Sequence, residues 1–121
     1  MVMNDLWAYR EPDWRKANLD GYRVEALDGE IGSINEQVNA PNGESYVVVD
    51  TGPWIFGHKV LLPAGLIDRV HPEEEKVYVE RTKDAVKEAP GFDEDRAADE
   101  SYLAEVGEYY AILGGARSVS V

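Results

Sequence analysis

The chain has 121 residues, 44% hydrophobic and 30% charged, which suits one folded domain and is too short for two full enzyme domains. Its 24 acidic residues against 12 basic ones give a formal net charge of −12. That charge argues against nucleic acid and anionic membranes as partners, because both are bound through Lys and Arg. The lack of cysteine excludes disulfides, thiolate metal sites and cysteine nucleophiles.

Two interpretations of the acidity stay open: a surface that keeps the protein soluble, or attraction to a basic partner. Residues 1–10 have neither the basic nor the apolar region of a signal peptide. No stretch approaches the roughly 20 apolar residues that span a bilayer. We therefore expect a cytoplasmic protein without membrane insertion.

The chain divides into an aromatic leader over 1–20, a strand-rich domain over 21–92, and an acidic linker, helix and tail over 93–121. In the middle part, alternation predicts a strand over 22–26, and Asp28-Gly29 is a two-residue hairpin signal. A return strand follows over 31–38, where Gly32 indicates a bulge or a close backbone approach.

Further strands are predicted over 45–51, 60–62 and 76–82, with a turn at Pro41-Asn42-Gly43. Residues 66–70 are either a sixth strand or a continuation of the strand over 60–62. The strand over 45–51 is nearly all apolar, as expected when both faces are covered. Five or six short strands with no long helix between them are typical of a small antiparallel barrel or sandwich and exclude a doubly wound parallel sheet.

Two helices are expected after the strands. Thr82 can cap a short one through Glu88, and a longer amphipathic one is predicted over 99–113 before Gly114-Gly115. Residues 72–108 hold 13 acids and five bases, so most of the net charge lies late in the chain. The last residues, 116–121, are expected to be disordered.

The order of motifs resembles the PRC-barrel family, named for the cytoplasmic domain of the photosynthetic reaction-centre H subunit and shared with a ribosome maturation factor. The matching segments lie within residues 20–95 and consist of Gly21–Val24, Leu27–Ile34, Tyr46–Gly52, Val60–Ile67, Val77–Val79 and Ala89–Asp93. The resemblance implies a six-stranded β-barrel that serves as an adaptor, without shared catalytic residues. The helix ending in Glu108-Tyr109-Tyr110 resembles an arm found in stand-alone bacterial members.

Large apolar side chains outside the predicted strands are the candidate contact surface for a protein partner. They are Trp54, Ile55 and Phe56 in a loop, Trp7 and Trp14 in the leader, and Tyr109 and Tyr110 in the arm. For the loop, plugging the barrel end is the alternative. For the leader, packing on the barrel or on a second copy is the alternative. This aromatic surplus also predicts a homodimer.

No site for metal or catalysis emerges from the sequence. His58 and His71 are the only histidines and lie outside any ligand spacing, so both are interpreted as surface residues. Asp93-Glu94-Asp95 with Asp99-Glu100 lacks the glycine and closing glutamate of a calcium loop. No serine lies in a nucleophile-elbow motif. We predict no cofactor, metal or catalytic residue.

The leading hypothesis is thus a non-catalytic protein-interaction or adaptor module of the PRC-barrel type. A small-ligand or metal sensor that uses the barrel end near Trp54 is the alternative. An enzyme with an unrecognised site is a third class.

Overall fold

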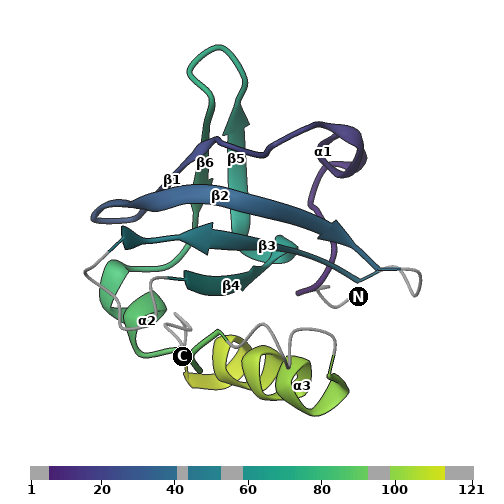
Figure 1. Ribbon diagram of the computed structural model, residues 1–121, viewed down its shortest axis with the longest axis vertical. Coiled ribbons are helices and arrows are strands. Elements are labelled where there is room, and N and C mark those ends of the chain that lie inside the picture. The colour runs from purple at the N-terminus through teal and green to yellow at the C-terminus, as the bar shows by residue number, and fades with distance from the viewer. Residues whose placement is uncertain (1–5, 41–43, 53–58, 93–98, 114–121) are drawn as a thin grey trace.

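The computed structural model describes residues 6–40, 44–52, 59–92 and 99–113 (Figure 1). Its strands are β1 (Arg23–Ala26), β2 (Gly29–Asn39), β3 (Ser45–Asp50), β4 (Lys59–Pro63), β5 (Ile67–His71) and β6 (Lys76–Val79). The helices are α1 (Pro12–Lys16), α2 (Lys83–Lys87) and α3 (Glu100–Glu108), with a 3-10 turn η2 (Ala64–Leu66) and a π-helical turn η4 (Tyr109–Leu113). All six strand segments and both C-terminal helices were predicted, whereas α1 was not. None of the helices in the described ranges is both long and apolar enough to cross a bilayer.

The strands form one mixed sheet in the order β4-β3-β2-β1-β6-β5. Four neighbouring pairs are antiparallel, but β1 and β6 are parallel, with Val24 opposite Val77. The expectation of a wholly antiparallel sheet is therefore wrong. The physical reason is that η2 leads from β4 to β5 without pairing them, and β6 then lies beside β1.

The sheet is strongly curled. Strands β4 and β5 occupy opposite edges of the sheet, yet only the three residues of η2 separate Pro63 from Ile67. So short a connection requires the two edges to approach each other, since an extended residue spans at most about 3.6 Å. Figure 1 shows β5 and β6 running across the direction of β2, β3 and β4. No pairing joins β4 to β5 among the described strands, so this sheet is not a closed barrel.

The hairpin between β1 and β2 turns one residue earlier than predicted. Its two turn residues are Leu27 and Asp28, while Gly29 begins β2 with a φ of 144° that favours glycine. The alternation over 22–26 and the Asp-Gly pair therefore locate the hairpin but misplace its register.

Gly32 combines both features that the sequence suggested for it. The register of β1 against β2 shifts just before Gly32, which leaves Ile31 as an extra residue. A Cβ at Gly32 would also lie 2.9 Å from the carbonyl carbon of Asp50. Only a glycine allows β2 and β3 to approach so closely.

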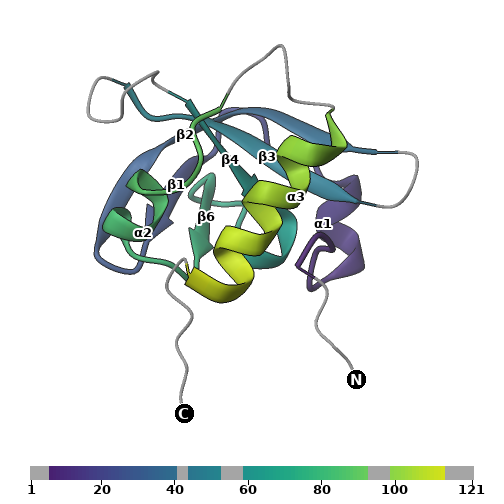
Figure 2. The same cartoon turned by 90° about the horizontal axis from the view of Figure 1, so that it is seen from below.

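A single core fills the curled sheet. Seven aliphatic side chains from five of the strands are at most 2% exposed: Val24, Ile34, Val47, Val49, Leu61, Val77 and Val79. Strand β3 is buried from Ser45 through Val49, as its apolar run predicted. The arm adds Tyr102, Val106 and Tyr110 to the same cluster, all at most 1% exposed. Spacings of four residues place them on one face of α3 and η4, which lies against the strands in Figure 2.

Candidate functional site

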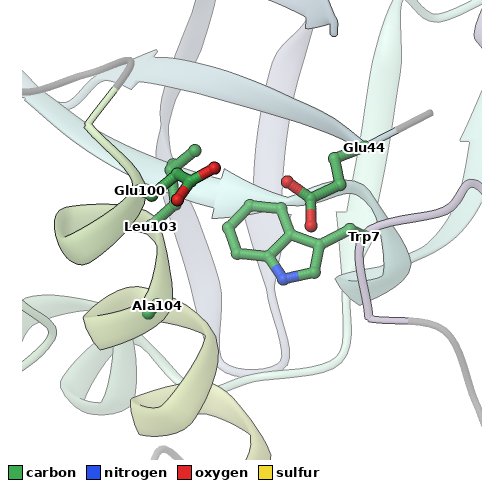
Figure 3. A pocket seen from close by; sticks show the side chains of 5 residues that line it. All are labelled: Trp7, Glu44, Glu100, Leu103 and Ala104. Atoms are coloured by element: carbon green, nitrogen blue, oxygen red, sulfur yellow. The ribbon is translucent and has the colours of Figure 1, made fainter. Parts of the chain in front are cut away.

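A surface pocket of about 190 Å³ opens between the leader, the start of β3 and the first turns of α3. Among the described residues, its lining consists of Trp7, Glu44, Glu100, Leu103 and Ala104. Figure 3 shows both carboxylates above the Trp7 indole, Glu44 next to the ring and Glu100 toward α3, with Leu103 and Ala104 along the helix. The pocket thus combines an aromatic ring, two acidic groups and an apolar wall, and none of the five lining residues within the described ranges is basic.

Backbone hydrogen bonds hold the leader so that Trp7 reaches this pocket. The Ser45 amide donates to the Trp7 carbonyl at 2.8 Å, and the Gly65 amide donates to the Leu6 carbonyl at 2.7 Å. The indole packs edge-on against Tyr46, with ring centroids 6.2 Å apart. A side chain thus fixed loses little conformational freedom when it binds a further group.

A glycine in α3 allows the helix to approach the indole. A Cβ on Gly107 would lie 3.2 Å from the Trp7 Nε1 atom, which is tighter than ordinary van der Waals contact. The leader and the arm therefore meet through Trp7 and Gly107. This contact brings Glu100, Leu103 and Ala104 of α3 beside the indole.

The two glutamates come from different ends of secondary structure. Glu44 directly precedes β3, and Glu100 is the first residue of α3. Asp99 caps this helix, since its carboxylate accepts a hydrogen bond from the Ser101 amide at 3.0 Å. The cap fixes where α3 begins, and with it the position from which Glu100 enters the pocket.

Gln37 on β2 secures the rest of the leader. Its Nε2 donates to the Tyr9 hydroxyl at 2.9 Å and to the Trp14 carbonyl at 3.1 Å, while its Oε1 accepts from the Leu19 amide at 3.1 Å. Burial raises the pKa of Tyr9 above its ordinary value of about 10, although the Gln37 bond acts in the opposite direction. Tyr9 and Trp14 are therefore partly covered by their own chain.

An arginine links the leader to the opposite edge of the sheet. The guanidinium of Arg10 donates to the Gly65 carbonyl, to Asp68 at 3.0 Å and to Glu80 at 2.7 Å. Because these groups are about two-fifths exposed, the ion pairs define position more than they add stability.

The two tyrosines proposed as contacts differ in their surroundings. Tyr110 is fully buried in the core, which corrects its assignment to a contact surface. Tyr109 is half-buried, and its hydroxyl donates to the Ala85 carbonyl at 2.6 Å. The arm uses both residues for its own docking, because the π-helical turn directs them to the core and to α2.

The aromatic surplus that predicted a homodimer is largely covered within one chain. Trp7 contacts Tyr46 and α3, Tyr9 and Trp14 contact Gln37, and Tyr102 belongs to the core. The homodimer stays a prediction, but the described aromatic residues no longer require it.

Most of the remaining predicted features lie outside the described residues. Trp54, Ile55, Phe56 and His58 lie outside the described residues, as do the acidic run over 93–95, the turn over 41–43 and the tail over 116–121. His71 ends β5 and packs edge-on against Tyr78, over which the Arg69 guanidinium lies 4.4 Å from the ring centroid. Within the described ranges, no three His, Asp or Glu side chains gather as a metal-binding group.

Sequence reasoning selected Trp7 but missed the other lining residues as a joint site. Glu100 was weighed in an acidic run that lacks the calcium-loop pattern, Leu103 lay within the predicted amphipathic helix, and Glu44 and Ala104 were not singled out. Their meeting depends on three segments far apart in the chain, for which a local pattern has no signal.

Two comparisons with known proteins returned no relative: none of the protein-family models matches this sequence, and no curated protein is significantly similar to it. The resemblance to PRC barrels therefore stays a prediction from the motifs.

Proposed function

We propose that the protein is a non-catalytic protein-interaction or adaptor module on a PRC-type barrel, working in the cytoplasm. The observation that carries the proposal is the surface pocket around Trp7. The PRC-type barrel draws support from the six strands and from the three-residue link between the sheet's edges, which curls the sheet almost upon itself.

The size of the pocket favours a side chain of a partner protein as its occupant. At about 190 Å³ it is smaller than the roughly 300 Å³ at which pockets for drug-sized ligands begin. Binding energy at protein interfaces concentrates in a few anchors that fill such pockets, and Trp is enriched among them. A fixed indole at the surface, half-buried by its own chain, provides that kind of anchor point.

Charge favours a basic partner. The net charge of the chain is −12, and the two ionisable groups that line the pocket in the described part of the chain are glutamates. Complementary charge speeds encounter and rejects wrong partners. Nucleic acid fits neither this charge nor this pocket. The alternative of a ligand sensor centred on Trp54 concerns residues outside the described ranges.

Blocking the pocket from the exposed side of α3 tests the proposal. Ala104→Arg adds a large side chain at an exposed pocket-lining position, and Ala111→Arg makes the same change at an exposed position outside the lining. Both variants should melt as the wild type does, because arginine is a good helix former.

Affinity capture is then carried out with each full-length protein immobilised. The wild type and Ala111→Arg should recover the same partner protein, and Ala104→Arg should recover at least about tenfold less of it. Reconstitution of that pair from purified components should reproduce the difference. If the two arginine variants capture the same proteins in equal amounts, the pocket is not an interaction site and the proposal loses its basis.

A further inference from the structure

We infer that the Trp7 pocket recognises the ammonium group of a lysine side chain on the partner. The inference rests on the proposed function and deepens it by naming the group that is bound. Its basis is the juxtaposition of one indole with two carboxylates at a surface pocket.

The indole and the carboxylates favour a cation for two separate reasons. A tryptophan face attracts an ammonium through its quadrupole, more strongly than other aromatic side chains do. Glu44 and Glu100 add negative charge beside the ring, and carboxylate oxygens accept hydrogen bonds from N–H donors. An uncharged ligand would gain neither the attraction to the ring face nor the charge attraction to the two carboxylates.

The placement of the acids favours an ammonium over a guanidinium. Arginine prefers two parallel bonds to one carboxylate, with its flat group stacked on a ring. Here the two carboxylates come from separate elements, Glu44 before β3 and Glu100 at the start of α3. A compact ammonium with three donors can bond to two separate carboxylates at once.

The apolar wall accommodates the rest of a lysine side chain. Leu103 is half-buried and Ala104 exposed, and together they border the pocket along α3. Lysine buries its four-carbon stem along apolar surface while its charged end remains among polar groups. Neither the apolar wall nor the indole supplies an oxygen ligand for a metal ion, and calcium requires six to eight of them.

Nuclear magnetic resonance with ¹⁵N-labelled full-length protein tests the inference. The three tryptophans give three indole N–H signals, of which Trp7→Phe identifies one. Titration with Nα-acetyl-lysine methylamide should shift the Trp7 indole signal and the backbone amides of Glu100 and Ala104. The Nε-acetylated form of the same compound, which has lost its charge, should leave them in place.

Two double variants separate the pocket from general charge. Glu44→Gln with Glu100→Gln removes both pocket acids and should raise the dissociation constant for the lysine probe at least about fivefold. Glu105→Gln with Glu108→Gln removes the same charge from exposed positions of α3 outside the lining and should change the constant less than twofold. Equal effects of the two pairs would overturn the inference in favour of diffuse attraction.

Three further outcomes would also overturn it. The neutral probe could shift the same signals as the charged one, Nα-acetyl-arginine methylamide could bind more tightly than the lysine probe, or the lysine probe could shift signals away from the pocket. Butylamine, which carries the stem and ammonium alone, should bind at the same place but more weakly than the lysine probe. Tighter binding of butylamine would instead indicate a free amine as the ligand.

Failure of this inference differs from failure of the proposed function. If Ala104→Arg depletes a captured partner while Glu44→Gln with Glu100→Gln does not, the interaction module stands and the lysine assignment falls. If the lysine probe binds as expected but Ala104→Arg depletes no protein, the pocket chemistry stands without the adaptor function.

Discussion

The carboxylate of Asp28 accepts a hydrogen bond from the backbone amide of Lys83 at 2.8 Å, joining the tip of the β1–β2 hairpin to the first turn of α2. The Thr82 hydroxyl accepts from the Ala85 amide at 3.1 Å in the same turn. Two amides that a helix leaves without internal partners are thus satisfied, one locally and one across the fold.

Asp28→Ala should therefore destabilise the protein by about 1 kcal/mol, as loss of a helix cap does, and Thr82→Ala should cost a similar amount. Urea denaturation measures both. Asp20→Ala, an exposed aspartate before β1, serves as the control and should change stability little. An Asp28→Ala effect no larger than that of Asp20→Ala would show that the hairpin tip does not support α2.

Gln37→Leu should release the leader from β2. The substitution removes the donor to Tyr9 and Trp14 and leaves the amide of Leu19, a fully buried residue, without its acceptor. We expect a loss of about 2 kcal/mol, since an orphaned buried amide carries its full desolvation cost. Hydrogen exchange at the Ala17 amide, which closes α1, should accelerate. Glu36→Leu places the same side chain at the exposed neighbouring position and should leave this exchange rate unchanged.

Tyr110→Phe and Tyr109→Phe should change stability in opposite directions. The Tyr110 hydroxyl is buried without a hydrogen-bond partner in the described part of the chain, so its removal relieves a desolvation cost. Tyr110→Phe should be neutral or stabilise by up to about 1 kcal/mol. Tyr109→Phe loses the bond to the Ala85 carbonyl and should destabilise by about 1 kcal/mol. The melting temperatures of the two variants test this prediction. A marked destabilisation by Tyr110→Phe would contradict the unpaired environment described for the Tyr110 hydroxyl.

Alkaline pH should destabilise the protein partly through Tyr110. Burial raises the pKa of Tyr110 far above its ordinary value of about 10, so the folded state keeps the phenol proton longer than the unfolded state does. The resulting stabilisation is fully present below pH 10 and is lost as pH rises beyond it. Between pH 9 and about 11, the free energy of unfolding, measured by chemical denaturation at each pH, should fall less steeply for Tyr110→Phe than for the wild type. If the free energy of unfolding has the same pH dependence in both proteins, Tyr110 does not contribute to the loss of stability at alkaline pH.

Gly32→Ala should be among the most damaging single changes in the chain. The added Cβ would lie 2.9 Å from the Asp50 carbonyl carbon and from the Thr51 Cα, and backbone atoms in a sheet cannot move aside cheaply. We expect a loss of about 3 kcal/mol in chemical denaturation. Gly91→Ala, where a Cβ meets nothing within 4 Å, is the matched control and should be close to neutral. A well-tolerated Gly32→Ala would mean that β2 and β3 can separate.

Much of the local structure was determined by the sequence alone. Alternation around Val24 and Val77, the apolar run from Tyr46 to Val49, and Thr82 as a cap each predicted an element that the structure contains. These signals are reliable because side-chain periodicity and capping act over a few residues. Short α1 escaped prediction, since its start at Pro12 lies among polar residues with no apolar period.

Only the tertiary structure decided the parallel pairing of β1 with β6 and the position of the pocket. Whether η2 reverses the chain or redirects it depends on which edge of the curled sheet β5 can join, and no residue within η2 encodes that choice. Likewise Trp7, Glu44 and Glu100 become neighbours because leader, β3 and α3 bury their apolar faces on one core. The hydrophobic effect that assembles them has no direction, so the sequence identifies the indole while packing selects the acids beside it.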